Sequence, residues 1–179
     1  MLWQPVIEFW FFELKPEQWW IKDSKLDQMI KQRFEAYLKA AISHELVTWR
    51  DQPRGRLAEV IVLDQFSRNI YRDTPQAFAA DEQAVALTLK AIEVGDDQSL
   101  TANERSFIYM PLMHSEDPDI HTLAVEMFTR LGNENNLQFE LKHKEIIDRF
   151  GRYPHRNEIL GRESTPEEIE FLKQPGSSF

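Results

Sequence analysis

The segment 63–69, of sequence LDQFSRN, places charged and amide side chains inside the most apolar stretch of the chain. On a helical wheel of about 100° per residue, Asp64 and Arg68 share one stripe, and large apolar side chains cover the rest of the circumference. A helix that is apolar all round is buried, and dehydrated charges must be paired. We therefore expect a buried helix from about Gly55 to Arg72 that contains a paired Asp64 and Arg68.

A second aspartate, Asp81, falls on the apolar stripe of the following helix. That stripe contains Phe78, Val85, Leu89 and Ile92. A guanidinium can pair with a carboxylate through two parallel hydrogen bonds, so Asp64, Arg68 and Asp81 are expected to form a bridged network. Gln65 and Asn69 lie beside the stripe, where they can cap backbone groups or face a pocket. The network is either an internal staple that fixes the helix register or part of a ligand site.

Two histidines lie at positions where chemistry is possible. Pro111 inside an apolar helix removes a hydrogen bond and bends the chain, so His114 and Glu116 emerge at a helix end. A histidine beside a carboxylate can act as a general base or as part of a metal site. The alternative is a polar helix end, where His114 is favoured by the helix dipole. His143 lies on an apolar face, where a histidine is usually a hydrogen-bonded core residue. Because no paired-histidine metal spacing is present, no metal is predicted.

The only basic cluster that the sequence of this acidic chain shows lies in one irregular segment, 149–162. Guanidinium groups on a constrained loop suit a phosphate or carboxylate ligand. Alternatively, the arginines fix the loop by satisfying carbonyls and by pairing with Glu158, Glu163 and the buried aspartates. The candidate ligand-binding residues of this segment are Arg152, His155, Arg156, Asn157 and Arg162, and Arg149 precedes them.

Composition excludes several classes of function. A net charge of −9 argues against nucleic acid or an anionic membrane as the main partner, since both need a basic face. The absence of cysteine removes disulfides and thiolate metal sites. The apolar start lacks a basic region and a small-residue cleavage site, and no apolar run approaches a membrane span. We therefore expect a cytoplasmic, soluble protein without a cofactor, and the oligomeric state stays open.

Turn and capping residues predict helices throughout, and alternating strand patterns are absent. The expected helices, besides 55–72, run from Ser24 to Ile42, from Thr74-Pro75 to Gly95, from Thr101 to His114, from Asp117-Pro118 to Gly132, from Asn135 or Asn136 to Phe150, and from Thr165 onward. Short connections between helices of this length favour antiparallel pairs. The sequence therefore predicts an all-α fold of about seven to eight helices in one domain, 1–179, with a loose tail from about 174.

The chain resembles one bacterial family, the domain of unknown function 924, over nearly its whole length. The resemblance is carried by FWF at 9–11, the segment 19–34, LDQFSRNIYR at 63–72, FAAD at 78–81, PLMHSED at 111–117 and the block 143–168. It implies a tetratricopeptide-like superhelix, and it implies no activity, catalytic residue or cofactor. The family commonly has glycine at the position of Phe12 and proline at that of Ser67. These departures are expected to alter the opening turn and to straighten the central helix.

Three functions remain open from the sequence. The first is binding of a small anionic ligand or a peptide segment in an interior polar pocket where the candidate residues converge. The second is a hydrolase or transferase with His114 or His155 as base, Asp64 or Glu116 as orienting carboxylate, and arginines that stabilise negative charge. In the third, the polar set only specifies the fold. We favour the first.

Overall fold

The computed structural model describes all 179 residues, and every regular element in it is helical. Seven α-helices have seven residues or more, which agrees with the expected seven to eight: α2, α3, α5, α6, α7, α8 and α10. The chain forms two compact units, Met1–Arg72 with Gln76–Pro111, and Asp73–Pro75 with Leu112–Phe179. The expectation of a single domain stays a prediction, as does the tetratricopeptide-like superhelix. None of the helices has both the length and the apolar character that crossing a membrane requires.

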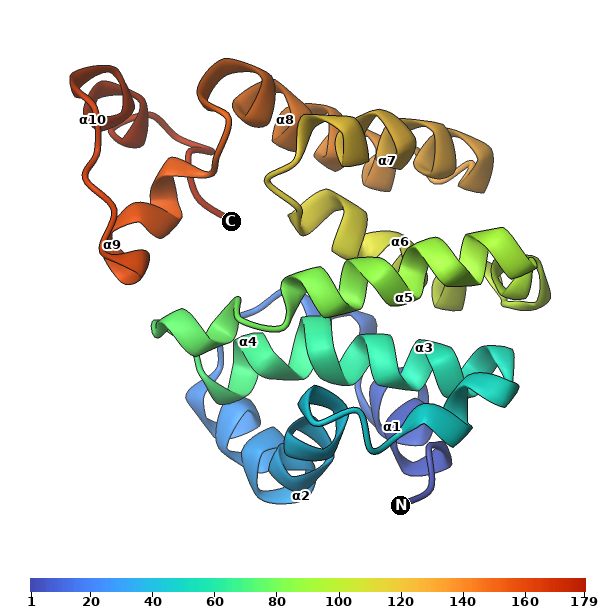
Figure 1. Cartoon of the computed structure of the whole chain (residues 1–179). Coiled ribbons are helices and arrows are strands. Elements are labelled where there is room, and N and C mark those ends of the chain that lie inside the picture. Colours follow the sequence, from blue (N-terminus) through green and yellow to red (C-terminus); the bar gives the residue numbers. More distant parts are fainter. The chain divides into compact units, whose positions relative to one another are not determined.

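The first unit is built around one long buried helical segment (Figure 1). That segment consists of α3 (Pro53–Ile61), a π-helical turn η4 (Val62–Phe66) and α4 (Ser67–Ile70). α2 (Ser24–Ile42) packs against η4 and α4, whereas α1 (Gln4–Glu8) and α5 (Asp81–Val94) pack against α3. Short turns η1 (Phe9–Glu13), η2 (Pro16–Trp19), η3 (Val47–Asp51), η5 (Pro75–Ala77) and η6 (Asp96–Ser99) connect these helices, and α6 (Ala102–His114) follows.

Aromatic side chains fill the core of the first unit. The ring of Phe34 lies 4.7 Å from that of Phe66 and 5.1 Å from that of Phe9, between ring centroids. Trp10 contacts Phe107 edge to face at 5.5 Å. Every residue from Gly55 to Ser67 is buried, as predicted for a helix that is apolar all round. This burial explains why a polar side chain within the segment must find a partner in the protein.

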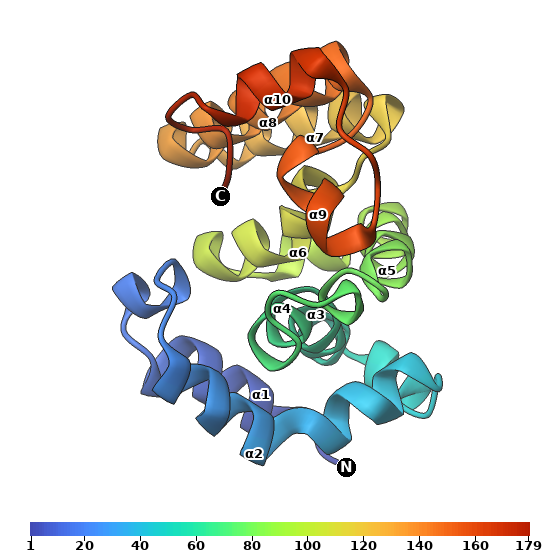
Figure 2. The ribbon, with the colours of Figure 1, turned by 90° about the vertical axis from the view of Figure 1, so that its left-hand side faces the viewer.

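The second unit contains an antiparallel helix pair, α7 (Pro118–Leu131) and α8 (Glu134–Phe150), which lie side by side in both ribbon views (Figure 1 and Figure 2). The turns η7 (Pro154–Arg156) and α9 (Asn157–Leu160) follow, and then α10 (Pro166–Leu172). Its small core comprises Ile146, Ile147 and Tyr153, packed with Phe150 and Phe171. Gly132 and Gly151 end α7 and α8 with positive φ angles of 79° and 70°, as predicted.

Capping groups fix most of the predicted helix starts. Thr101 with Glu104, and Thr165 with Glu168, form reciprocal capping boxes. Asp117 caps α7, and Pro118 occupies the first turn. All of these were predicted.

Two predicted caps were displaced by one or more residues. α2 is capped by Asp23, one residue before the expected start at Ser24, because the Asp23 carboxylate accepts from the backbone N–H groups of Lys25 and Leu26. α8 is capped by Asn133, so this helix starts before Asn135. In both helices another short polar side chain stands just before the predicted start and reaches the first free N–H groups.

The prediction for α5 was wrong at its start and in its buried face. Residues 75–77 form only a short 3₁₀ turn, and the α-helix begins at Asp81. The buried side of α5 is formed by Ala84, Leu87, Thr88 and Ala91. Leu89, which was assigned to the core stripe, is 37% exposed. Small residues allow α5 to approach its neighbours closely, and a wheel that weights only large apolar residues misplaces such a face.

Candidate functional site

Arg68 and two aspartates form the predicted network in the first unit. The Nη1 and Nη2 atoms of Arg68 donate to the two carboxylate oxygens of Asp81 at 2.8 and 3.0 Å. Nη1 also donates to the backbone carbonyl of Asp64 at 2.8 Å and lies 3.5 Å from the Asp64 carboxylate. Asp64 is buried, whereas one-fifth of the Arg68 side chain is exposed. The guanidinium therefore bridges the central helix to the start of α5.

The predicted amides also have partners in this unit. Gln65 Nε2 donates to Asp64 Oδ2 at 2.8 Å, and Asn69 Nδ2 donates to Asp27 Oδ1 at the same distance. Asp64 and Gln65 both lie in the π-helical turn η4, which the sequence did not predict. Single π-helical turns inside α-helices are frequent at functional sites. The turn sits immediately before Ser67, whose hydroxyl donates to the carbonyl of Leu63.

In the second unit, the arginines of the basic segment hold that segment in place. Arg152 pairs with both oxygens of Glu168, at 2.9 and 2.7 Å. Arg162 pairs with both oxygens of Glu116, at 2.9 and 3.1 Å, and its Nε donates to Asn157. These contacts support the interpretation in which the arginines fix the loop. The partners differ from those expected, because Glu163 accepts only through its backbone carbonyl.

These pairs shift the titration of the two carboxylates. The hydrogen bond from Arg152 is the main reason that the pKa of Glu168 falls to about 2. Burial raises the pKa of Glu116, but the hydrogen bonds from Arg162 and from the Tyr153 backbone together lower it below its usual value. Both carboxylates are therefore held charged at neutral pH, and both oxygens of Glu116 are already engaged. Glu116 does not have the free oxygen that an orienting carboxylate needs.

The remaining residues of the basic segment are also anchored. Arg156 is buried, donates to the backbone carbonyl of His114 at 3.0 Å, and lies over the ring of Tyr153 at 4.7 Å. Asn157 donates to Ser164 and to Glu168. His155 packs beside Tyr153, with 5.8 Å between ring centroids. The basic segment after α8 is thus held in place by hydrogen bonds and ring contacts.

The sequence did not predict a buried pair in the second unit, formed by His121 and Glu140. His121 Nδ1 lies 2.6 Å from Glu140 Oε1, and both side chains are fully buried. His121 Nε2 lies 2.6 Å from the Ser115 carbonyl and 3.1 Å from the Tyr153 hydroxyl. Burial raises the pKa of Glu140 despite the neighbouring histidine. A signal was available, because His121 and Glu140 are polar side chains on the buried faces of α7 and α8, as Asp64 is in the buried turn η4.

His143 is a hydrogen-bonded core histidine, as the sequence indicated. Its Nδ1 lies 2.6 Å from the carbonyl of Phe139, one turn earlier in α8. Burial holds the pKa of His143 at about 3, so the ring is neutral at physiological pH. The side chain of Phe139 itself is exposed. No group of three or more His, Cys, Asp or Glu side chains is arranged to hold a metal ion.

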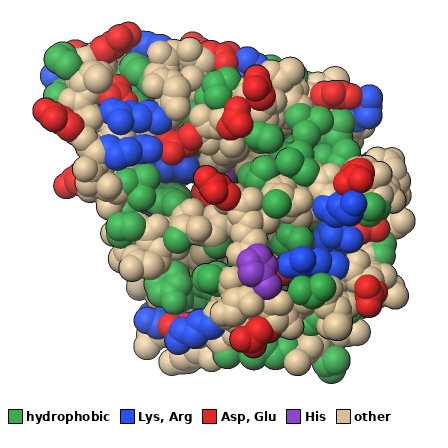
Figure 3. Space-filling model, viewed as in Figure 1, with side chains coloured by type: hydrophobic (Ala, Val, Ile, Leu, Met, Phe, Trp, Pro, Cys, Tyr) green, Lys and Arg blue, Asp and Glu red, His purple; other side chains and the backbone are tan.

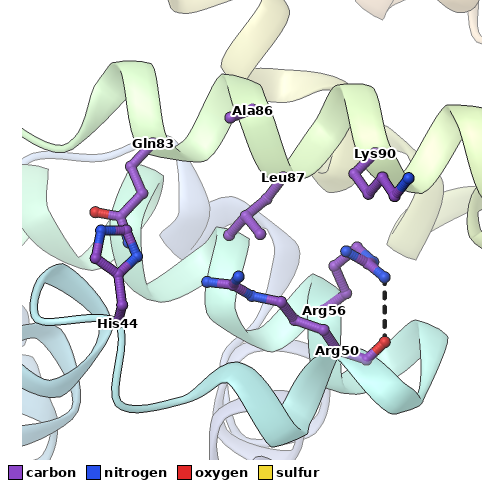
Figure 4. A pocket seen from close by; sticks show the side chains of 7 residues that line it. All are labelled: His44, Arg50, Arg56, Gln83, Ala86, Leu87 and Lys90. Carbon is purple, nitrogen blue, oxygen red and sulfur yellow. Dashed lines mark hydrogen bonds between the residues drawn. The ribbon is translucent and has the colours of Figure 1, made fainter.

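A small cleft in the first unit has a basic lining (Figure 4). Its volume is about 200 Å³. We call it the basic cleft; its lining residues are His44, Arg50, Arg56, Gln83, Ala86, Leu87 and Lys90. Gln83, Leu87 and Lys90 follow one another at helical spacing along one side of α5, and the arginines come from η3 and α3. On the face drawn in Figure 3, basic side chains gather beside a histidine, with acidic ones among them.

Both arginines of the basic cleft are fixed by carboxylates. Arg50 donates through Nε and Nη2 to Glu59, at 2.8 and 2.7 Å, and Glu59 is fully buried. Arg56 donates through Nε to Asp96 at 2.7 Å and through Nη2 to the carbonyl of Arg50 at 3.1 Å. Figure 4 shows the second of these bonds. In each guanidinium the Nη1 group makes no hydrogen bond within the protein.

His44 has an unusual backbone at the edge of the cleft. Its φ angle is +59°, in the left-handed region that residues other than glycine seldom adopt. Gln83 Nε2 donates to the Ala41 carbonyl at 2.7 Å and lies 3.3 Å from His44 Nδ1. Because an amide nitrogen can only donate, Nδ1 is the acceptor, and the ring proton of neutral His44 lies on Nε2. Strained backbone of this kind is most common at functional sites.

Comparison with known proteins agrees with the resemblance seen in the sequence. The model of the family described as bacterial protein of unknown function (DUF924) matches residues 6–176. The chain belongs to this family. A solved structure of a protein of unknown function from Agrobacterium tumefaciens is similar, with 36% sequence identity, 96% of each chain covered and a TM-score of 0.91. No curated protein matches the chain.

The predicted site residues of this DUF924 member fall into two groups. Asp64, Gln65, Arg68, Asn69 and Asp81 belong to the first unit, and the others, from His114 to Arg162, belong to the second. Arg68 bonds Asp64 and Asp81 in the first unit, and Arg162 bonds Glu116 and Asn157 in the second, whereas Asn69, His143 and Arg152 have other partners. None of the predicted residues lines the basic cleft. Their convergence in one interior chamber stays a prediction. The basic cleft itself was not foreseen, since its arginines are separated along the sequence from Gln83 and Lys90 and share no motif with them.

Proposed function

We propose that this DUF924 protein binds a small anionic molecule, and that the ligand sits in the basic cleft. One observation carries the proposal: two guanidinium groups that are fixed in place keep donors unused at a cleft of the first unit. The sequence alone favoured an anionic ligand near the basic segment 149–162. In that segment Arg152 and Arg162 are paired with Glu168 and Glu116, and no cleft is described beside them, so we place the ligand in the basic cleft instead.

The two arginines of the basic cleft are preorganised for a ligand, because carboxylates of the protein hold them in place. Glu59 and Asp96 orient Arg50 and Arg56 from one side, and the Nη1 groups are left over. A donor that is already fixed loses little conformational entropy on binding. Lys90 adds a cation, since its side chain is about half exposed and its ammonium pairs with Glu93 at the surface. Charge-assisted hydrogen bonds from such groups are the stronger ones in proteins.

The size of the cleft limits the ligand class. A water molecule occupies about 30 Å³ of liquid, so the 200 Å³ cleft holds roughly the volume of six to seven waters. This is below the range of about 300–1,000 Å³ that is typical of sites for drug-sized ligands. Leu87 and Ala86 supply an apolar wall. Phosphate, sulfate or a short dicarboxylate fits these limits, and a nucleotide is too large.

The experiment is calorimetric titration of the full chain with inorganic phosphate and, separately, with malonate. We expect saturable binding that weakens with added salt, because the interaction is charge-assisted. Lys90→Gln should raise the dissociation constant at least fivefold. Lys173→Gln is the matched control, since it removes another exposed lysine that pairs with a nearby glutamate, and it should leave binding unchanged.

Two outcomes would count against the proposal. One is the absence of saturable binding of either anion by the wild-type chain. The other is an equal effect of Lys90→Gln and Lys173→Gln, which would indicate general surface charge. Arg50 is unsuitable as the first variant, because its removal would leave the buried Glu59 carboxylate without its partner and so destabilise the fold.

For Asp64, Arg68 and Asp81 we propose a structural role as a staple between the central helix and α5. The proposal is supported by the doubly bonded Arg68–Asp81 pair and by the burial of Asp64. It predicts that Arg68→Met lowers stability and leaves the affinity for phosphate unchanged in the fraction that remains folded.

A further inference from the structure

Phe179 occupies a site made of three other rings in the second unit. Its ring centroid lies 3.8 Å from that of His143, 4.5 Å from that of His155 and 5.2 Å from that of Tyr153. We call the surface formed by His143, Tyr153 and His155 the ring site. Tyr153 meets Phe179 edge to face at 86°, and His155 does so at 65°. These are the arrangements that aromatic groups prefer, so the ring site is shaped for a flat ring.

One polar atom of the ring site is not used. His143 has its proton on Nδ1, because this nitrogen bonds the carbonyl of Phe139. Its other nitrogen, Nε2, therefore carries a lone pair, and it makes no hydrogen bond in the protein. Burial keeps the imidazole neutral, with a pKa of about 3, so this lone pair persists across the physiological range. The hydrocarbon ring of Phe179 cannot donate to it.

We propose that the ring site binds a planar aromatic group that carries a hydrogen-bond donor, of the phenol or indole class, and that Phe179 fills this site in cis. A phenol or indole would reproduce the ring contacts of Phe179. Its O–H or N–H would in addition satisfy His143 Nε2, which Phe179 leaves unpaired. A donor-bearing ligand therefore gains a hydrogen bond that the hydrocarbon ring of the built-in occupant cannot make.

The occupant is held loosely enough to be displaced. Phe179 is 49% exposed, and no hydrogen bond holds Ser178 or Phe179. The last anchor of the segment is Ser177, whose hydroxyl donates to the Leu172 carbonyl at 3.2 Å. Gly176, with a φ angle of +79°, forms the turn that precedes it. A tethered group of this kind competes at an effective concentration of about the millimolar range.

The test uses p-cresol as the donor-bearing probe and toluene as its hydrocarbon match. Binding is followed in the full chain by the ¹⁵N chemical shift of the His143 ring. Phe179→Ala should bind p-cresol about tenfold more tightly than the wild type, because the competitor is gone. Phe12→Ala is the control: it removes an exposed phenylalanine of the first unit and should not change p-cresol binding.

A second variant tests the hydrogen bond. In the Phe179→Ala background, p-cresol should bind about two- to tenfold more tightly than toluene and should shift the Nε2 resonance. Adding His143→Phe should abolish that preference. The proposal is overturned if Phe179→Ala gains no affinity over the wild type. It is equally overturned if p-cresol and toluene bind alike and leave Nε2 unshifted.

Discussion

His143 should make the stability of the second unit fall as the solution is acidified. The folded chain holds its imidazole neutral down to a pKa of about 3, because the ring is buried. An unfolded histidine takes up a proton at about pH 6.5. Between these two values the unfolded state binds more protons than the folded state, so stability is fully present above pH 6.5 and is lost as the pH falls.

The magnitude follows from these two pKa values. From pH 7 to pH 5 the loss is about 2 kcal/mol, which corresponds to a change of about 25-fold in the unfolding equilibrium. The titratable groups that act on His143 through charge are His114, His121 and His155, so the prediction is stated as a difference between two chains. Wild type and His143→Gln should differ in their pH dependence by that amount.

Amide hydrogen exchange within α8, followed by mass spectrometry, measures this effect locally. Tryptophan fluorescence would not serve, because all five tryptophans lie in the first unit. After correction for intrinsic exchange rates, protection of α8 should fall about 25-fold more in the wild type than in His143→Gln between pH 7 and pH 5. His44→Gln, which removes an exposed histidine, should behave as the wild type. Equal pH dependence in the wild type and His143→Gln would refute the reasoning.

Three further substitutions test other contacts, each by urea denaturation followed by circular dichroism. Glu168→Gln should lower the free energy of unfolding at pH 7 by about 3 kcal/mol, since it removes the charge that pairs with Arg152, whereas the glutamine oxygen can still accept from the Thr165 N–H; a loss below about 0.5 kcal/mol would contradict this. Arg68→Met should lower the free energy of unfolding by about 3–5 kcal/mol, because it leaves two carboxylates without the guanidinium that bridges them. An unchanged stability would contradict the proposed structural role of this network. Gly55→Ala should lower the free energy of unfolding, because the new Cβ would collide with the Trp49 carbonyl. Alanine usually stabilises a helix by about 1 kcal/mol relative to glycine, so a gain in stability would show instead that η3 moves away from the new side chain.

The helices could be predicted because their start and stop signals are local. The capping box of Thr165 and Glu168 acts within one turn, and the glycine after α8 needs only its own φ angle. The face that a helix buries is decided by its neighbours, which are distant in sequence. This is why α5 was assigned the wrong core stripe, and why the π-helical turn at Asp64 could not be foreseen.

The sequence predicts which residue types form the buried polar pairs, but it predicts much less well which residues pair with one another. A charge at a core position of an apolar helix signals a buried pair, and this rule found Asp64 and Arg68. If the same rule is applied to every predicted helix, it also finds Glu59 in the same helix, and His121 and Glu140 in α7 and α8. It could not have named their partners, because Arg50, Ser115 and Tyr153 are brought to them by turns.

The availability of an arginine for a ligand depends on which of its donors the fold has already used. Arg162 makes four hydrogen bonds through its three guanidinium nitrogens, to Asn157, Glu116 and the Tyr153 carbonyl, so little of its donor capacity is left for an anion. Arg50 spends two nitrogens on one buried carboxylate and keeps the third. Both are arginines near turns, and the sequence offers nothing to separate them. In both arginines a carboxylate meets one edge of the guanidinium, and the difference is that the remaining nitrogen of Arg162 donates to Asn157 whereas that of Arg50 makes no bond; this difference supports the basic cleft in our proposal.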